Sequence, residues 1–269
     1  MEDKKQPTIV LHVGMHKTGT TFLQWNVFPF LNAKFHWHIF YKSWLKDVLN
    51  LSKEIDISKI NKKLKKTLSK EKINIISEEN IYTYQFTKED DRFERLERIK
   101  KIFPNAKIIF GSRRREENLV SWYVEYVSVG GTLDFKGFLK NYMNLKKLDY
   151  QPYIKKLEEL YGKENVFDYS IDELRKDQDE FIKKLCDFIG VEKPGKYRKQ
   201  PSRVGYSLKI LRISLLLNRF FKTPVNPEGI IPWWGPILPQ NLLFHSFMFK
   251  KINRKKVSLD DINEINIDF

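Results

Sequence analysis

The segment from Thr8 to Trp25 constrains the fold more than any other part of the chain. Its first six residues, Thr8 to Val13, are apolar and rich in β-branched side chains, so they predict a buried strand. A turn is expected over residues 14–18, and a helix from Gly19 to about Pro29. A buried strand that leads through a short loop into a helix is typical of α/β proteins.

Further apolar runs predict strands, and the stretches between them predict helices. Strands are expected at 36–40, which is the weakest, and at 73–77, 106–111 and 165–169. Helices are expected at 41–70, 89–102, 116–127, 134–145, 150–161, 177–189 and 206–221. This alternation predicts a three-layer α/β fold, in which a central and mainly parallel sheet is flanked by helices. Ligands of such sheets bind beyond the carboxyl ends of the strands.

The domain organisation follows from length and from a change in composition. A chain of 269 residues suits one sizeable domain, and it contains no internal repeat and no Gly/Ser-rich linker. Residues 222–269 differ from the rest because they hold five prolines and the pair Trp233-Trp234. We expect one domain over 1–221 and an irregular extension, 222–269, packed on the same domain.

The loop after the first strand has the chemistry of an anion site. It reads His16-Lys17-Thr18-Gly19-Thr20-Thr21 and opens a helix, whose free N–H groups favour a negative charge. Lysine adds a full charge, the threonines add hydroxyls, and glycine lets the backbone approach closely. A Walker A loop needs its lysine after the glycine, and here Lys17 precedes Gly19. The loop is therefore not expected to bind a nucleoside triphosphate with Mg²⁺.

A second basic element follows the strand at 106–111. Three arginines, Arg113, Arg114 and Arg115, come directly after this strand, and Ser121 lies eight residues beyond Arg113 in the next helix. A guanidinium fork and a serine hydroxyl can converge on one phosphate. The residues alone leave open which arginine would do so.

These two elements, in this order, resemble those of the PAPS-dependent sulfotransferases, which use 3′-phosphoadenosine 5′-phosphosulfate. The stretch from Gly14 to Thr21 is similar to the phosphosulfate loop of bacterial members, and its Lys-Thr-Gly-Thr-Thr core to that of Golgi glycan sulfotransferases. The resemblance implies a P-loop-like fold. It also implies that Lys17 contacts the oxygen bridging phosphate and sulfate, while residues 18–21, with His16 beside them, hold the 5′-phosphate.

The resemblance also gives the second element a role. It implies that Arg113 and Ser121 bind the 3′-phosphate, since the family has an arginine and a serine at this spacing. The family's usual Asp/Asn-Pro after the arginine is absent, and Arg114 and Arg115 stand in its place. Arg203 resembles a residue of a later loop that closes on the same phosphate. The similarity extends over about residues 8–221.

The base of the reaction is expected among residues that follow the strand at 73–77. Glu78 and Glu79 stand there, and similar glycan sulfotransferases use a glutamate after the corresponding strand. Alternation predicts that one of the two faces the cleft, and Glu78 is slightly favoured. His16 and His12 are rival bases for which structural roles are expected. His36 and His38 could line an acceptor cleft.

No metal is expected. The chain has five histidines and one cysteine, Cys186, which lies on an apolar helical stripe and is expected to be a buried structural thiol. His12 and His16 have a spacing that converges only on a helix, whereas here it runs from a strand into a loop. Lysine and backbone N–H groups can stabilise the charge of sulfuryl transfer.

The acceptor is less defined than the donor. The resemblance favours a hydroxyl, or an amine, of a saccharide or glycoconjugate, with small metabolites as alternatives. The net charge of +15 is compatible with an anionic acceptor or with peripheral contact with an anionic membrane surface. Apolar segments too short to span a bilayer, and a polar beginning of the chain, lead us to expect a cytoplasmic protein.

Three alternative functions are carried forward. A P-loop kinase would need a Walker A lysine and a Walker B aspartate, and neither is found in the sequence. A nucleic-acid-binding protein would need a basic stripe with stacking aromatic residues and no organised phosphate loop, so no nucleic acid partner is expected. A sulfotransferase fold that binds the product PAP without catalysis is the third.

Overall fold

The computed structural model describes residues 7–37, 43–197, 206–232 and 257–263. These residues form two compact units. The first comprises the described residues up to Gln85, then Glu89–Arg113, then those from Lys146 to 197. The second comprises Phe86–Lys88, Arg114–Leu145 and the described residues after 205. Each unit is described by itself.

The first unit is built on a five-stranded sheet in which every pair of neighbouring strands is parallel. The strands are β1 (Ile9–His12), β2 (Lys34–His36), β3 (Asn74–Ser77), β4 (Lys107–Ser112) and β5 (Val166–Ser170), in the order β2-β3-β1-β4-β5. The chain thus leaves β1 on one side and later returns on its other side. Such a reversal places a ligand site at the carboxyl end of the central strand.

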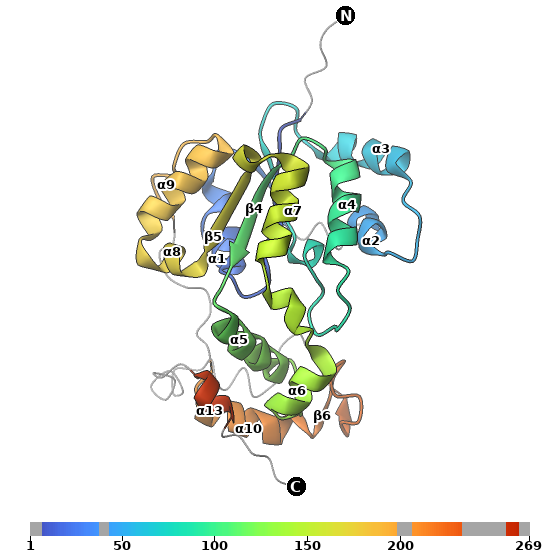
Figure 1. Cartoon of the computed structure of the whole chain (residues 1–269), viewed down its shortest axis with the longest axis vertical. Helices are drawn as coiled ribbons and strands as arrows, with labels where there is room; N and C mark the ends of the chain where they lie inside the picture. The colour runs from blue at the N-terminus through green and yellow to red at the C-terminus, as the bar shows by residue number, and fades with distance from the viewer. Residues whose placement is uncertain (1–6, 38–42, 198–205, 233–256, 264–269) are drawn as a thin grey trace, which may run out of the picture. The chain divides into compact units, whose positions relative to one another are not determined.

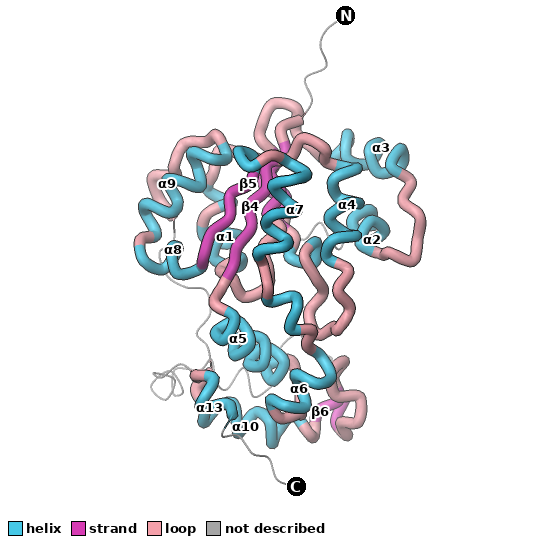
Figure 2. The backbone as a smooth tube through the Cα atoms, in the orientation of Figure 1, coloured by secondary structure: helices cyan, strands magenta, loops and turns pink. Residues whose placement is uncertain are grey.

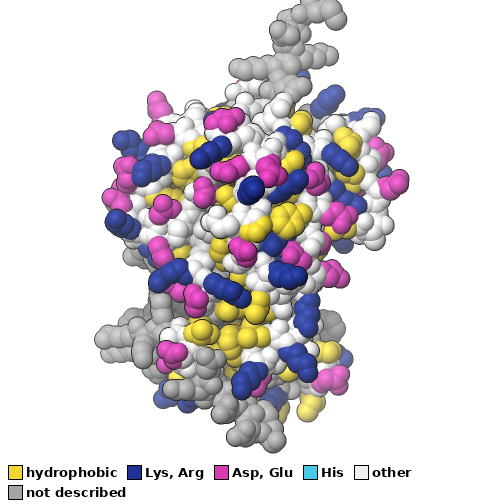
Figure 3. Space-filling model, in the orientation of Figure 1, with side chains coloured by type: hydrophobic (Ala, Val, Ile, Leu, Met, Phe, Trp, Pro, Cys, Tyr) yellow, Lys and Arg dark blue, Asp and Glu magenta, His cyan; other side chains and the backbone are white. Residues whose placement is uncertain are grey.

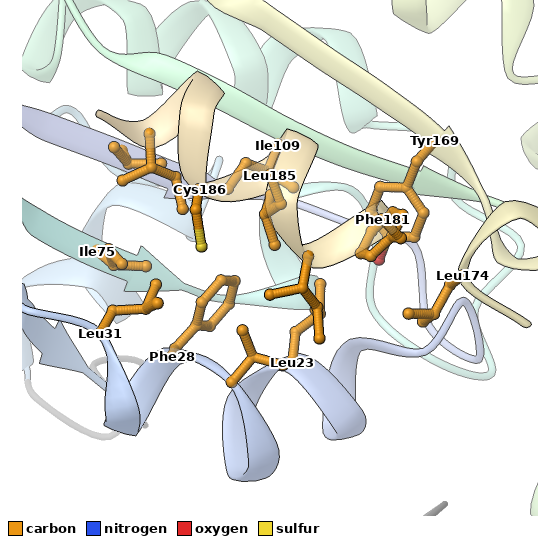
Figure 4. Packing of buried hydrophobic residues seen from close by; sticks show 14 of the residues in the cluster. Leu23, Phe28, Leu31, Ile75, Ile109, Tyr169, Leu174, Phe181, Leu185 and Cys186 are labelled. Atoms are coloured by element: carbon orange, nitrogen blue, oxygen red, sulfur yellow. The ribbon is translucent and has the colours of Figure 1, made fainter. Parts of the chain in front are cut away.

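One face of this sheet is covered by α1 (Thr20–Asn26), α8 (Ile171–Lys176) and α9 (Gln178–Ile189), as Figure 1 shows. Apolar side chains of these helices pack on Val10, Ile75 and Ile109 of the three central strands, and Figure 4 shows this cluster at close range. Cys186 lies in the cluster, and burial raises the pKa of its thiol to about 11. The expectation of a buried structural thiol agrees with this position.

The opposite face of the sheet is covered by α4 (Arg92–Ile102) and α7 (Gln151–Tyr161), beside α2 (Ser43–Leu49) and α3 (Ile57–Thr67). Phe110 of β4 contacts Tyr153 of α7, with ring centroids 5.3 Å apart. Figure 2 shows the strands between the two helical layers. The predicted three-layer α/β fold with a central parallel sheet is confirmed.

Several predicted elements differ from the observed ones in extent. The helix expected over 41–70 is two helices, because Asp56 caps the start of α3 by accepting a hydrogen bond from the Lys59 N–H. The strand expected at 36–40 lies earlier, at Lys34–His36, and residues 38–42 are outside the described part. Helix α8 was not predicted. A capping box between Ser170 and Glu173 stabilises the N-terminus of this short helix.

The second unit is largely helical. Its elements are α5 (Arg115–Ser128), α6 (Phe135–Tyr142), α10 (Leu208–Asn218), the short strands β6 (Phe221–Lys222) and β7 (Ile231–Pro232), and α13 (Leu259–Asn263). Its core is aromatic, with Trp122, Tyr126 and Phe138 buried around Phe86. Residues 222–232 and 257–263 belong to this unit, and the boundary at 221/222 stays a prediction.

Short 3-10 helices complete the secondary structure: η1 (Phe28–Phe30), η3 (Glu79–Ile81), η4 (Leu145–Leu148) and η5 (Lys163–Asn165). None of the helices in the described ranges is long and apolar enough to cross a membrane. On the face seen in Figure 3, Lys and Arg side chains are interspersed with Asp and Glu. The positive charge visible there is therefore spread among acidic groups.

Candidate functional site at the carboxyl edge of the sheet

The loop between β1 and α1 is held in a tight, defined conformation. The Thr18 hydroxyl is buried and donates a hydrogen bond to the Met15 carbonyl at 2.6 Å, which closes the loop on itself. Lys17 and Gly19 both have positive φ, 70° and 91°. A left-handed conformation is costly for a lysine, and such strain persists only where the surroundings enforce it. The expected turn is therefore an ordered cradle.

Helix α1 begins at this cradle. Gly19 is its N-cap and provides no side-chain cap, while the Gly19 carbonyl accepts from the N–H groups of Phe22 and Leu23 at 2.9 and 3.2 Å. The N–H groups of the first helical residues, Thr20 and Thr21, have no acceptor within a helix. An uncapped N-terminus with a lysine beside it suits an anion.

Residues of β4 and β5 pack against the cradle. The Tyr169 hydroxyl of β5 donates to the Thr18 carbonyl at 3.3 Å. Gly111 of β4 lies against the same two residues, since a Cβ placed there would come within 2.6 Å of Tyr169 and 2.8 Å of the Thr18 Oγ1. The roles of Tyr169 and Gly111 were not predicted from the sequence, although each residue stands near the carboxyl end of a predicted strand.

Arg113 joins the second basic element to the loop. Its Nη1 donates to the Lys17 carbonyl at 3.2 Å. Arg114 instead pairs with Glu117, and its side chain is 67% exposed. Arg113 is thus bonded to the cradle. Ser121 is half-buried on α5 in the second unit, and Arg203 lies outside the described residues.

Glu79 lies beside the cradle. Its Oε2 is 2.5 Å from the Nδ1 of His16. Burial alone would raise the pKa of Glu79, but the charge and hydrogen bond of His16, together with Thr20, outweigh it, so the net pKa is lowered. The side chain remains 19% exposed, so the carboxylate is partly open to solvent.

The carboxylate of Glu78 makes different contacts from that of Glu79. Its Oε1 accepts from the backbone N–H of Asn80 at 3.1 Å and from the Asn80 side chain at 2.7 Å, which caps η3. Burial raises the pKa of Glu78, and only 7% of the residue is exposed. The contacts of Glu78 with Asn80 thus do not support the slight preference for Glu78 as the cleft-facing residue. Glu79 is the glutamate that contacts His16 of the loop.

The side chain of His16 is buried and is bonded to other protein groups. Its Nε2 lies 3.0 Å from the Thr83 carbonyl, while its Nδ1 meets Glu79. Both ring nitrogens are therefore engaged by protein atoms. The backbone of His16 remains part of the cradle.

His12 ends β1 directly below the loop and is fully buried. Its Nδ1 is 2.7 Å from the Ser77 hydroxyl, which also accepts from the Gln24 side chain at 2.9 Å. Burial lowers the pKa of His12 to about 4, against the opposing effect of the Glu79 charge. A neutral, enclosed imidazole fits a structural role better than that of a base open to an acceptor.

The other predicted histidines do not form a described cleft. His36 is buried, and its Nε2 lies 3.0 Å from the Asn74 side chain on the neighbouring strand. His38 lies outside the described residues. Within the described ranges, no group of three or more His, Cys, Asp or Glu side chains could hold a metal ion. The expectation that no metal is required stays a prediction.

The described first unit therefore has a P-loop-like α/β fold, and the loop between β1 and α1 lies at the switch point of its sheet. The chain matches the family model described as the sulfotransferase family over residues 24–195. This match starts beyond the loop, so the motif at Lys17–Thr21 is a separate observation that points to the same family. The chain belongs to the sulfotransferase family.

Of three similar solved structures, the first supports the fold. A sulfotransferase from Alicyclobacillus acidocaldarius superposes with a TM-score of 0.54 at 17% identity, over 80% of this chain and 93% of that one. Mouse sulfotransferase SULT7A1, complexed with PAP, gives 0.41 at 19% identity, over 69% and 59%. The sulfotransferase domain from the curacin biosynthetic pathway gives 0.41 at 13% identity, over 94% and 100%. No curated protein matches the chain by sequence.

Proposed function

We propose that this sulfotransferase moves the sulfuryl group of PAPS to a hydroxyl or amine of an acceptor, with Lys17 and Glu79 as the two groups that act on the reacting atoms. The observation that carries the proposal is the contact of 2.5 Å between the Glu79 carboxylate and the Nδ1 of His16, the residue before Lys17. It supports a base beside an uncapped helix N-terminus, where an anionic donor is stabilised.

The cradle would hold the 5′-phosphosulfate. Backbone N–H groups of residues 16–21 and the hydroxyls of Thr20 and Thr21 are the candidate donors. The Thr18 hydroxyl is already committed to the Met15 carbonyl, so Thr18 would contribute its backbone alone. Lys17 would place its ammonium against the oxygen that becomes the leaving group.

The 3′-phosphate would be bound by Arg113 and Ser121, with Arg203 as a further candidate. The bond from Arg113 to the Lys17 carbonyl supports this choice over Arg114, which is exposed and paired with Glu117. A guanidinium is suited to a phosphate because it donates two parallel hydrogen bonds. Recognition of this phosphate would distinguish PAPS from ATP, which carries a hydroxyl there.

The transfer itself needs one base and one stabilised leaving group. The acceptor oxygen or nitrogen forms a bond to sulfur, and the bond from sulfur to the phosphate oxygen of PAPS breaks. The electron pair leaves with PAP, whose new charge Lys17 neutralises. The acceptor proton passes to Glu79, whose lowered pKa keeps it ionised at neutral pH.

A saccharide or glycoconjugate is the acceptor that we propose. The similarity of the Lys-Thr-Gly-Thr-Thr motif to that of glycan sulfotransferases supports it, as does a glutamate in the position of the base. The net charge of +15 favours acceptors that are themselves anionic. Contact with an anionic membrane surface is a weaker extension of the same reasoning.

The test is a transfer assay with PAPS and a panel of neutral saccharides, anionic polysaccharides and small alcohols or amines. PAP release that depends on an acceptor, with a sulfated product identified by mass spectrometry, would support the proposal. Glu79→Gln should abolish it while PAP binding remains. Acceptor-dependent release that survives Glu79→Gln would remove Glu79 from the role of base, and release with non-sugar acceptors alone would overturn the saccharide assignment.

A further inference from the structure

We propose that His16 is a positioning residue whose two ring nitrogens both donate hydrogen bonds, one to the Thr83 carbonyl and one to the Glu79 carboxylate, and so hold that carboxylate in register with the phosphosulfate loop. The inference rests on the proposed role of Glu79 as base and adds a residue that the motif assigns only to donor binding. It concerns the protonation and geometry of His16, and both can be measured without turnover.

The first step is the hydrogen-bond chemistry of the ring. The Thr83 carbonyl can only accept, so the Nε2 of His16, 3.0 Å away, must carry a proton. The Nδ1 lies 2.5 Å from the Glu79 Oε2, which is within the reach of a charge-assisted hydrogen bond. If Glu79 is ionised, the Nδ1 carries a proton as well, and the ring is an imidazolium.

The second step is the charge state of Glu79. Its carboxylate accepts from His16, and this bond favours the ionised form. The titratable groups that act on it are His16 of the loop, His12 of β1, Glu78 of its own segment and Tyr169 of β5. Of these, the neighbouring His16 is the one that lowers its pKa most.

The third step is mechanical. The Thr83 carbonyl belongs to a segment that is fixed elsewhere, since Arg95 donates to the Asn80 carbonyl at 2.8 Å and the Tyr82 hydroxyl donates to the Lys147 carbonyl at 2.5 Å. Thr83 is fully buried. His16 therefore ties the residue before Lys17 to a rigid frame and to the base at once.

The consequence is that the base and the donor cradle share one anchor. A shift of the loop would move Glu79 with it, and loss of the anchor would leave both groups present but out of register. Because reacting groups must be placed within about 1 Å, such a loss costs turnover more than donor binding.

Two variants separate the two bonds. In His16→Asn, the amide can take the place of Nδ1 and donate to Glu79, but the charge and the Thr83 bond are lost. In His16→Gln, the amide can take the place of Nε2 and reach Thr83, but the bond to Glu79 is lost. Both should keep the Kd for PAP within about threefold, because backbone N–H groups provide the cradle.

The first measurement is made on the free protein. Nitrogen-15 NMR of the histidine side chains at pH 7.5, assigned by His16→Asn, should show both His16 nitrogens protonated. A nitrogen of His16 that carries no proton at this pH would overturn the proposal, since the pair would then be neutral. This readout does not depend on whether Glu79 is the base.

The second measurement is the pH profile of kcat/KM. His16→Asn should shift the acidic limb to higher pH, because Glu79 loses its cationic neighbour, and His16→Gln should lower kcat by about 10- to 100-fold. An unchanged acidic limb and unchanged kcat in both variants would contradict the positioning role. If Glu79→Gln itself stays active, the proposed base fails, and the NMR result still decides the charge of His16.

Discussion

The Arg113 guanidinium donates a hydrogen bond to the carbonyl oxygen of Lys17 at 3.2 Å. Lys17 holds a positive φ of 70° at this position. One arginine thus fixes the backbone of the residue proposed to stabilise the leaving group. The two motifs that the sequence separates by almost a hundred residues are physically joined at the carboxyl edge of the sheet.

Replacing Arg113 should therefore weaken binding of two kinds of nucleotide unequally. In Arg113→Ala, loss of charge-assisted hydrogen bonds should weaken PAP by about 10- to 100-fold. A nucleotide that lacks the 3′-phosphate should lose much less, through the loosened Lys17 backbone alone. Calorimetric titration with both measures the difference, and Arg114→Ala is the matched control, since Arg114 is exposed and paired with Glu117. Equal losses would remove Arg113 from 3′-phosphate recognition.

The two adjacent glutamates should differ sharply. Glu79→Gln removes the proposed base and should lower kcat by about 10²- to 10⁴-fold while PAP still binds. Glu78→Gln keeps an oxygen that can accept from the Asn80 N–H, so it should retain most activity. Steady-state kinetics on both variants make the comparison. Inactive Glu78→Gln with active Glu79→Gln would assign the base to the other residue.

Gly111 offers a test of the support under the cradle. In Gly111→Ala, the new methyl group would come within 2.6 Å of Tyr169 and 2.8 Å of the Thr18 Oγ1, so the loop must shift. We expect a loss of about 1–3 kcal/mol in the free energy of unfolding and weaker PAP binding. Gly195→Ala is the control, because no heavy atom lies within 4 Å of a Cβ there. Wild-type affinity in Gly111→Ala would mean that the loop tolerates the displacement.

His12 should make stability depend on pH. Its pKa is about 4 in the folded protein and about 6.5 when unfolded, so the unfolded chain binds more protons between these values. The free energy of unfolding should be highest above pH 6.5 and decrease on acidification toward pH 4. Between pH 7 and pH 5, His12 should account for about 2 kcal/mol of the decrease.

The check is denaturant unfolding at both pH values. His12→Asn can still contact Ser77 but does not titrate, so its stability should fall by about 2 kcal/mol less than that of wild type over the same interval. Only the difference between the two pH values is compared, since the substitution also changes packing against Phe28. Equal slopes for both proteins would show that His12 is not held neutral in the folded state.

The sheet could be predicted from the sequence because its central strands are short runs of apolar residues. Residues 73–77 and 106–111 predict strands that the structure has at Asn74–Ser77 and Lys107–Ser112. The break at Asp56 was missed because a helical stripe of Lys and Ile continues on both sides of it. A capping residue can break a helix even where the apolar periodicity continues, and the sequence alone does not show which of the two signals decides.

For the candidate site, spacing predicted which residues gather but not which way they face. The rule that polar residues collect at carboxyl ends of strands brought the loop, the glutamates and Arg113 to one edge. It could not choose between Glu78 and Glu79, because the choice depends on η3, where Asn80 draws Glu78 into a cap. Nor could it foresee that His16 binds Thr83, since that carbonyl lies 67 residues away.

The most direct test of the central claim is calorimetric titration of the wild type and of Lys17→Ala with PAP and with ATP, each with and without Mg²⁺, together with the kcat of both proteins with PAPS. We predict tight PAP binding without metal, much weaker binding of ATP, and, in Lys17→Ala, a folded protein whose kcat with PAPS falls by about 10²- to 10³-fold. A preference for ATP with Mg²⁺, or a folded wild type that does not bind PAP, would contradict the assignment of the loop to a phosphosulfate donor.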